Sequence, residues 1–252
     1  MLKARIVTAL FLVAGFLALL FFAPPAAAAA SFAAVAALAA WEWAGLMKID
    51  RAGRWLYAGL ILISCLAAWN QPAFAFPKLW WISAAFWLML APIWLYRRWP
   101  LAANDMLGYG AGWVLIVPTW AAMVGLHERS PWLLLTLVAL VWVADIAAYF
   151  TGRTFGRHRL APAISPGKTW EGVAGAVAGV LLYGVATGLT VGIGVLILLT
   201  GVSIVGDLFE SMVKREAGVK DSSNLLPGHG GILDRIDSLT AALPLAALLV
   251  IS

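Results

Sequence analysis

Charged residues are scarce in this chain of 252 residues. Asp, Glu, Lys and Arg together make up only 12% of it, whereas 63% of the residues are hydrophobic. No polar stretch exceeds about 20 residues, which is too short for a soluble domain with a core of its own. The composition therefore excludes a soluble globular protein and predicts an all-α integral membrane protein, whose apolar helices cross a bilayer.

Cysteine is almost absent, since Cys65 is the one cysteine and it lies within an apolar run. A single cysteine excludes an intrachain disulfide and a cysteine-based metal site. We expect Cys65 to be a small buried or lipid-facing side chain. The chain also lacks a convincing internal repeat, which argues against a transporter built from inverted repeats.

Hydrophobic residues form long segments, each close to the length of about 20 residues that a membrane-spanning helix needs. We identify nine: about 6–23, 26–46, 54–69, 78–96, 106–126, 132–150, 171–187, 190–212 and 233–251. The first also resembles a signal peptide, because Lys3 and Arg5 precede it and alanines follow Pro25. Its length and its direct passage into a second apolar segment favour a retained helix instead.

Basic residues predict the orientation, because cytoplasmic loops are enriched in Lys and Arg. Nine spans with the N-terminus inside and the C-terminus outside place 15 of the 17 Lys and Arg in the cytoplasm, leaving Lys78 and Arg129 outside. The net charge of +5 is spread between hydrophobic runs, so it predicts contact with anionic lipid phosphate and not with nucleic acid. This topology puts both long polar loops, 151–170 and 213–232, on the cytoplasmic side.

We divide the chain into N-terminal helices, 1–140, and a C-terminal region, 141–252. The acidic residues that are candidates for a functional site lie in the C-terminal region. One group follows three- and four-residue spacing and shares a helix face: Asp207, Glu210, Ser211 and Lys214. A second group lies at a similar depth on two other helices: Asp145, Asp234 and Asp237. Carboxylates from three helices at one level predict an oxygen-rich site that suits Mg²⁺. The alternative is that each carboxylate only pairs with a nearby Lys or Arg.

The loop 213–232 has the composition of a phosphate-binding loop. Gly228, Gly230 and Gly231 permit backbone conformations and close approaches that a Cβ forbids. Their N–H groups and the positive end of the ninth helix can face an anion. Basic residues add positive charge: Lys214, Arg215, Lys220 and Arg235. His229 could bind metal, donate to phosphate or brace the loop, and we favour the last two because carboxylates suit a hard cation better. Plain turns and a solvated basic face are the alternatives.

The loop 151–170 contains a Pro-Gly-Lys-Thr run that suggests a P-loop. Pro162 stands where that motif needs its first glycine, and no strand is expected before it. A turn into the seventh helix fits better, with Thr169 as the N-cap and Glu171 in the first turn. Ser165 and Lys168 then lie where a phosphate could bind. The alternative is a positive-inside loop followed by a capped helix.

Residues 211–237, SMVKREAGVKDSSNLLPGHGGILDRID, resemble the signature of the phosphatidate cytidylyltransferases, also known as CDP-diacylglycerol synthases. The similarity extends upstream through residues 145–152 and 165–172, and to Trp41-Glu42-Trp43 near the N-terminus. Residues 55–140 match only as hydrophobic spans. A pattern of more than a dozen fixed positions is specific, so the resemblance covers both ends of the chain.

The resemblance implies that CTP and phosphatidate react to give CDP-diacylglycerol and pyrophosphate. It also implies a polytopic inner-membrane homodimer that uses Mg²⁺ with a neighbouring K⁺, held by Asp207 and Asp234, with Asp237 and Asp221 as further candidates. We assign the remaining site residues to catalysis or to substrate binding: Lys168, Lys214, Arg215, Lys220, Arg235, His229, Ser165, Thr169, Glu171, Ser211, Asp221, Gly230 and Gly231.

Other functions stay open at this point. A transporter or channel with a cation site at Asp145, Asp207 and Asp234 would explain buried acids, but transport sites tend to lie near the midplane. Another CTP-using lipid enzyme, such as a polyprenol kinase, would release CDP instead of pyrophosphate. A CDP-alcohol phosphotransferase is disfavoured, because the D-G-x-x-A-R start of its motif is missing.

Overall fold

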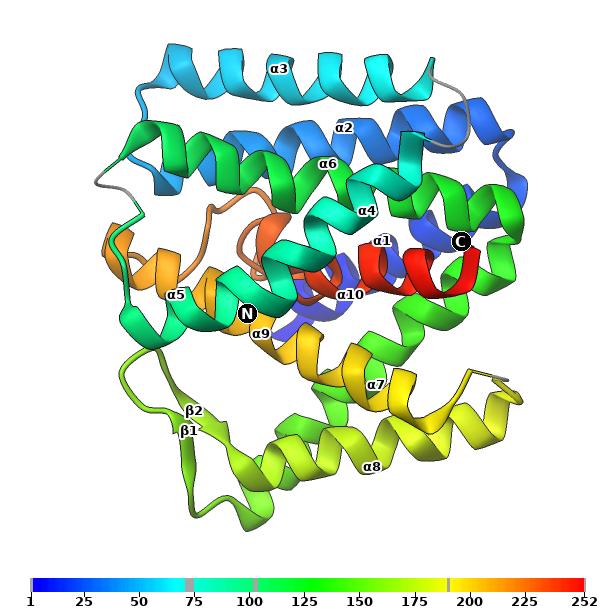
Figure 1. Ribbon diagram of the computed structural model, residues 1–252, viewed down its shortest axis with the longest axis vertical. Coiled ribbons are helices and arrows are strands. Elements are labelled where there is room, and N and C mark those ends of the chain that lie inside the picture. Colours follow the sequence, from blue (N-terminus) through cyan, green and yellow to red (C-terminus); the bar gives the residue numbers. More distant parts are fainter. Residues whose placement is uncertain (1, 71–74, 102–103, 190, 252) are drawn as a thin grey trace.

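The computed structural model describes residues 2–70, 75–101, 104–189 and 191–251 (Figure 1). Its helices are α1 (Leu2–Phe22), α2 (Pro25–Leu46), α3 (Arg51–Trp69), α4 (Ala75–Ala85), the π-helical turn η1 (Phe86–Leu90), α5 (Ala91–Arg97), α6 (Asp105–Arg129), α7 (Pro131–Phe155), α8 (Trp170–Thr187), α9 (Ile193–Ala217) and α10 (Leu233–Ile251). A short antiparallel hairpin, β1 (Arg159–Ala161) and β2 (Ser165–Thr169), precedes α8. Each predicted hydrophobic segment is therefore helical within the described residues, with α4, η1 and α5 forming one segment.

Seven of the described helical segments are long and apolar enough to cross a membrane. They are α2, α3, the combined α4–η1–α5 segment, α6, α7, α8 and α9. The apolar part of α1, Val7–Phe22, is shorter, and α10 begins with Asp234, Arg235 and Asp237. The fold is that of a helical multi-pass membrane protein, as predicted. The count of nine spans, their orientation and the division into two regions stay predictions.

The connections between helices gather at two opposite ends of the bundle (Figure 1). The end at the left of Figure 1 carries the α2–α3 turn, the hairpin and the segment 218–232, and we call it the polar end. The opposite end carries the α8–α9 connection and the C-terminus. Both long polar loops therefore lie at the same end of the molecule, as the predicted topology requires.

Two helices continue beyond the apolar segments that predicted them. α7 reaches Phe155 and α9 reaches Ala217, so that Lys214 and Arg215 belong to a helix and not to a loop. Hydropathy ends where polar residues begin, whereas backbone hydrogen bonding continues. The expectation that no strand precedes the Pro-Gly-Lys-Thr run was wrong, because β1 lies before it and the run itself belongs to β2. The P-loop remains excluded by Pro162.

α10 lies at the centre of the bundle and packs against α9, α6, α4 and α2. Pro244 within α10 has no N–H, so it leaves the carbonyl of Thr240 without its helical donor. Trp87 Nε1 and Thr119 Oγ1 donate to that carbonyl at 3.0 and 3.2 Å. Trp87 belongs to η1 and Thr119 to α6, so these hydrogen bonds fix α10 against both elements.

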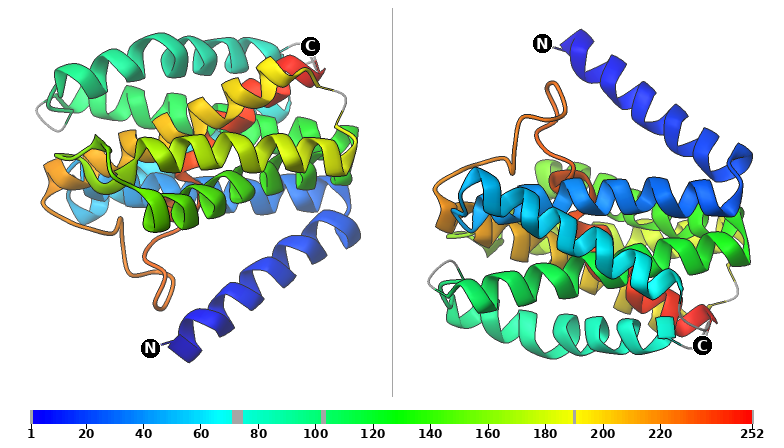
Figure 2. Two further views of the ribbon diagram at one scale, coloured as in Figure 1. Left: turned by 90° about the horizontal axis from the view of Figure 1, so that it is seen from below. Right: turned by 90° about the horizontal axis from the view of Figure 1, so that it is seen from above.

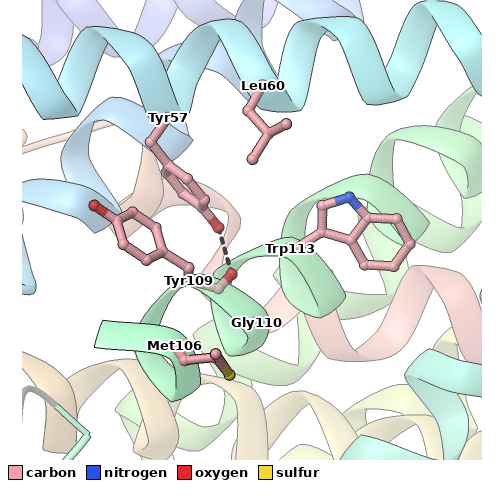
Figure 3. A pocket seen from close by; sticks show the side chains of 6 residues that line it. All are labelled: Tyr57, Leu60, Met106, Tyr109, Gly110 and Trp113. Atoms are coloured by element: carbon pink, nitrogen blue, oxygen red, sulfur yellow. Dashed lines mark hydrogen bonds between the residues drawn. The ribbon is translucent and has the colours of Figure 1, made fainter. Parts of the chain in front are cut away.

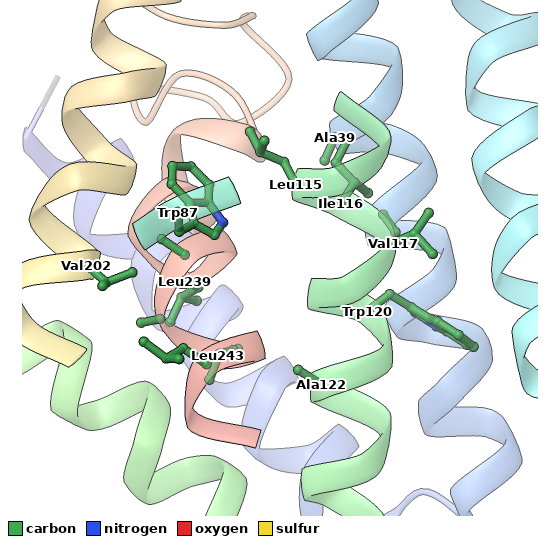
Figure 4. Packing of buried hydrophobic residues seen from close by; sticks show 14 of the residues in the cluster. Ala39, Trp87, Leu115, Ile116, Val117, Trp120, Ala122, Val202, Leu239 and Leu243 are labelled. Atoms are coloured by element: carbon green, nitrogen blue, oxygen red, sulfur yellow. The ribbon is translucent and has the colours of Figure 1, made fainter. Parts of the chain in front are cut away.

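The core around α10 is apolar and tightly packed (Figure 4). Large side chains such as Trp87 and Leu243 are buried there, and Cys65 is buried as expected. A Cβ at Gly206 would lie 2.8 Å from the carbonyl oxygen of Asp237. The missing side chain therefore allows α9 and α10 to approach closely. This contact brings the acidic faces of the two helices together.

α1 leaves the bundle toward its N-terminus, on the same side as the projecting loop that precedes α10 (Figure 2). Thr8 Oγ1 donates to the carbonyl of Pro227 in that loop at 3.3 Å. The first segment is thus a helix whose described part touches the segment 218–232, which we call the glycine-rich loop.

Candidate active site

A buried charge cluster lies at the polar end, around Lys214 of α9. Lys214 Nζ lies 2.7 Å from Glu210 Oε2 and 2.6 Å from Asp234 Oδ1. The Glu210 and Asp234 side chains are only 2% and 4% exposed. Charge-assisted hydrogen bonds of this length offset part of the cost of burying the charges. The predicted helix face of α9 is therefore joined to the start of α10 by one ammonium group.

Asp234 is also enclosed by the loop that precedes it. Its Oδ2 accepts hydrogen bonds from the N–H groups of Ser222 and Gly231, at 2.9 and 2.8 Å, and from the Ser222 hydroxyl at 2.9 Å. Gly230 has a φ of 80°, and a Cβ there would lie 2.7 Å from Asp234 Oδ2. Glycine is therefore required at this position by both its backbone conformation and its contact with Asp234.

Glu42 of α2 is a site residue to which the sequence alone assigned no role. Its side chain is fully buried, and its carboxylate accepts from the N–H groups of Ile232 and Leu233 at 3.0 and 2.7 Å. It also accepts from the hydroxyls of Ser222 and Ser223 at 3.1 and 2.6 Å. The anion at the N-terminus of α10 is thus the Glu42 carboxylate, whose negative charge is stabilised by the positive end of the helix dipole. This differs from the expectation that a substrate phosphate faces these N–H groups.

A signal for Glu42 was present in the sequence. It is an acidic residue within the apolar, alanine-rich segment 26–46, and such residues are usually functional. The resemblance at Trp41-Glu42-Trp43 marked the position but not its contacts. Those contacts depend on two segments about 190 residues apart, which no local pattern connects.

A second, more accessible ion pair joins the hairpin to α9. Lys168 Nζ of β2 lies 2.5 Å from Asp207 Oδ2, and these side chains are 23% and 27% exposed. Ser211 donates to Asp207 Oδ1 at 3.3 Å, as its four-residue spacing predicts. Asp145 of α7 is close enough for its charge to interact with those of Asp207 and Lys168. Solutes can therefore reach Asp207 more readily than Asp234.

The start of α8 is closed by neighbouring residues. Thr169 Oγ1 accepts from the N–H of Gly172 at 3.1 Å, which confirms the predicted N-cap. Glu171 lies in the first turn, as predicted, and its Oε1 lies 2.7 Å from His158 Nδ1. Glu171 therefore fastens the approach to the hairpin onto the start of α8.

Exposed basic side chains surround the two ion pairs. Arg215 donates to the carbonyls of Ile164 and Val219 at 3.5 and 3.2 Å, which ties the hairpin to the end of α9. Lys220 and Arg235 are exposed, and neither forms a salt bridge within the described parts of the chain. Those two side chains remain available for anionic ligands.

His229 lies in the same glycine-rich loop and has one nitrogen with an open role. Its backbone N–H donates to the Leu226 carbonyl at 2.8 Å, so the residue braces a tight turn. Its ring Nδ1 is buried and has no hydrogen-bond partner among the described residues. Of the other predicted site residues, Ser165 is partly exposed on β2, and Asp221 is exposed in the segment 218–232.

The carboxylates were tested for their fit to a metal ion. Among the residues that the structure describes, no three His, Cys, Asp or Glu side chains enclose such a site by themselves. Mg²⁺ usually takes one or two carboxylates and completes its shell with water and substrate phosphates, so this does not conflict with a metal. Glu210 Oε1 is buried without a hydrogen-bond partner in the described chain, and Asp237 lies within electrostatic range of Glu210 and Asp207. A cation there would offset the repulsion between these carboxylates, so the residues fit Mg²⁺.

An apolar groove lies between α3 and α6, and no residue of the charge cluster lines it (Figure 3). It has a volume of about 530 Å³ and is lined by Tyr57, Leu60, Met106, Tyr109, Gly110 and Trp113. No charged side chain lines it, so it suits hydrocarbon and not phosphate. The basic and acidic side chains at the polar end suit an anionic ligand better than this groove does.

Comparison with known proteins gives a consistent result. The sequence profile of the family described as "Cytidylyltransferase family" matches residues 3–252. A phosphatidate cytidylyltransferase of Pseudomonas aeruginosa is 43% identical over 270 residues, covering 99% of this chain and 97% of the relative. One of Haemophilus influenzae is 36% identical over 296 residues, covering 97% and 96%. One of Brucella suis is 46% identical over 156 residues, covering 58% and 54%.

Two of these relatives match along almost their whole length, and the family profile covers nearly the entire chain, including both ion pairs and the glycine-rich loop. This chain belongs to the cytidylyltransferase family.

Proposed function

We propose that the protein is a phosphatidate cytidylyltransferase, which converts CTP and phosphatidate to CDP-diacylglycerol and pyrophosphate. The observation that carries the proposal is the gathering of carboxylates and basic side chains from α9, α10 and β2 at one end of a membrane bundle. The names of the full-length relatives support the choice of substrates.

The chemistry requires charge neutralisation more than a strong base. A phosphate oxygen of phosphatidate forms a bond to the α-phosphorus of CTP, while the bond from that phosphorus to the bridging oxygen breaks. Pyrophosphate leaves with the electron pair. Because the nucleophile is already anionic, no proton has to be removed from it by a strong base. The protein must instead bring two polyanions together in line.

The basic side chains divide into two groups by their accessibility. Lys168, Lys220 and Arg235 would bind substrate phosphates, because the first is partly exposed and the other two are free of salt bridges in the described chain. Lys214 is buried between two carboxylates, so it would hold Asp234 in place. It would stabilise substrate phosphates through its charge and not by touching them. Arg215 and Glu171 would keep the hairpin over the site.

Asp207, Asp234 and Asp237 would hold Mg²⁺, with K⁺ as its neighbour, as the family resemblance implies. When bound, the metal neutralises phosphate charge and stabilises the leaving pyrophosphate. Asp207 is the most available of these ligands, since its Oδ1 has only one weak partner at 3.3 Å. Asp234 already accepts four hydrogen bonds, so a metal would share Oδ1 with Lys214 or Oδ2 with the loop.

The polar end would face the cytoplasm of a bacterial inner membrane. Fifteen of the 17 Lys and Arg fall on the inner side in the predicted topology, which supports this orientation. Phosphatidate could then keep its acyl chains in the bilayer while CTP arrives from the cytoplasm. We also propose the homodimer that the resemblance implies, which native mass spectrometry in detergent would test.

The function is tested by incubating the purified protein with CTP and Mg²⁺ in mixed detergent–phosphatidate micelles. We expect pyrophosphate release that depends on phosphatidate and Mg²⁺, with CDP-diacylglycerol as the lipid product. Release of CDP and a phosphorylated lipid would indicate a CTP-dependent lipid kinase instead. No turnover by folded protein, together with ion flux in proteoliposomes, would indicate a transporter and overturn the proposal.

A further inference from the structure

We infer that Glu42 is a positioning residue for the transfer reaction: from α2 it clamps the base of the loop 222–233 and thereby aims Asp234 into the site. The inference rests on the proposed function for its catalytic consequence, and on the geometry alone for the clamp. Glu42 contacts neither α9 nor any residue of the hairpin by hydrogen bond in the described structure.

Each oxygen of Glu42 joins the beginning of the loop to its end. Oε1 accepts from the Ser223 hydroxyl at 2.6 Å and from the Ile232 N–H at 3.0 Å. Oε2 accepts from the Ser222 hydroxyl at 3.1 Å and from the Leu233 N–H at 2.7 Å. The carboxylate therefore closes residues 224–231 into a loop whose two ends are fixed to the same helix, α2.

The clamp shares its partners with Asp234. The Ser222 hydroxyl lies 3.1 Å from Glu42 Oε2 and 2.9 Å from Asp234 Oδ2, and the Ser222 N–H also donates to Asp234. Gly231 lies between the two acids: a Cβ there would stand 2.6 Å from both Glu42 oxygens. Movement of the Glu42 carboxylate would therefore displace the donors that orient Asp234.

The energetics indicate that Glu42 serves the loop and not the packing of α2. It is fully buried, and although Arg54 of α3 is close enough for its charge to interact with that of Glu42, the two side chains form no salt bridge among the described residues. Burying an ionised carboxylate without a paired cation is costly, and hydrogen bonds to N–H groups at a helix start offset the cost. An apolar side chain would satisfy α2, whose neighbouring buried residues are mostly alanine.

The test uses Glu42→Gln, which keeps the side-chain size but replaces one acceptor oxygen with an NH₂ group. The backbone N–H of Ile232 or Leu233 then loses its acceptor, and the serine hydroxyl at the same position must turn to accept from the NH₂ group. We expect kcat to fall by about 10- to 100-fold, as for supporting residues behind a site, while KM for CTP changes less. Hydrogen–deuterium exchange of a peptide covering residues 224–233 should become faster, with exchange in α6 unchanged.

Glu216→Gln is the matched control. Its carboxylate also accepts a backbone N–H from a distant segment, that of Leu101, at 3.1 and 3.3 Å, but it accepts no hydrogen bond from residues 222–233 in the described structure. This variant should retain wild-type kcat and wild-type exchange at residues 224–233. Gly231→Ala should shift kcat and exchange in the same direction as Glu42→Gln, because the new methyl group would displace both the Ser222 hydroxyl and the Glu42 carboxylate. If Glu42→Gln does not fold, Ser223→Ala removes a single donor and should shift kcat and exchange in the same direction.

Wild-type exchange at residues 224–233 in Glu42→Gln would overturn the clamp. Faster exchange with a wild-type kcat would overturn the positioning role. The same holds if Glu42→Gln has a lower melting temperature but its folded molecules keep full activity. The exchange measurement needs no substrate. A wild-type protein that protects these amides but releases no pyrophosphate would thus contradict the proposed function and leave the clamp intact.

Discussion

Two of the helices that begin at the polar end, α8 and α10, are capped in different ways. The start of α8 is capped by Thr169, three residues from the N–H that it accepts, and by Glu171, which binds His158 only 13 residues away. The start of α10 is capped by Glu42, which lies 190 residues before the first N–H that it accepts. The first arrangement forms wherever its own segment folds, whereas the second exists only once α2 and α10 have packed together.

The difference matters because the buried ion pairs lie at the start of α10. Its loop is held by two carboxylates, those of Glu42 and Asp234, and Asp234 is tied to α9 through Lys214. A site built on these long-range contacts forms only once α2, α9 and α10 have packed together. The locally closed hairpin brings Lys168 to the rim of that site, where it is more exposed.

The largest expected effect is at the start of α10, which is held by contacts between distant segments. Asp234→Asn replaces one acceptor oxygen with an NH₂ group that must face either Lys214 or the N–H donors of the loop. We expect the fold to persist, because the side chains have nearly the same size, and pyrophosphate release to fall by at least about 100-fold. Steady-state assays over a Mg²⁺ titration check this. Near-normal turnover at saturating Mg²⁺ would remove Asp234 from the proposed metal site.

A smaller effect is expected at the start of α8, which is capped by residues of its own segment. Thr169→Ala removes the N-cap of α8 and should lower the free energy of unfolding by about 1 kcal/mol. Thermal unfolding in detergent measures this, and Thr169→Ser, which keeps the hydroxyl, is the control. A loss of activity as large as that of Asp234→Asn would show that the Thr169 hydroxyl contacts substrate in addition to capping the helix.

The smallest effect is expected at the opposite end of the bundle. Lys78 is exposed on α4 and lies outside the membrane in the predicted topology. Lys78→Ala should leave pyrophosphate release within about twofold of wild type, because exposed substitutions away from a site change little. A large loss would contradict the proposed topology, in which the polar end alone carries the chemistry.

The same comparison explains how much the sequence could predict. The hydrophobic segments, the Thr169 cap and the shared face of Asp207, Glu210, Ser211 and Lys214 all follow from spacing within one helix. The structure confirms the cap directly, and it confirms the spacing through the Asp207–Ser211 and Glu210–Lys214 contacts.

The remaining features depend on contacts between distant segments. The donors around Glu42 and the hydrogen bond from Trp87 to the Thr240 carbonyl join residues that no local pattern relates. The glycines illustrate both cases: their presence predicted a tight loop, but which anion their neighbouring N–H groups face could not be predicted. In the structure that anion is a carboxylate of the chain itself.

The central claim is that the hairpin and the α9–α10 cluster act as one site. A double-mutant cycle with Lys168→Ala and Asp207→Asn tests it most directly, with kcat/KM for CTP measured for each variant. Because the two side chains form an ion pair of 2.5 Å at this site, we predict that the double variant is no worse than the more damaged single variant. If the two losses multiply instead, the side chains act independently and the account of a single site is wrong.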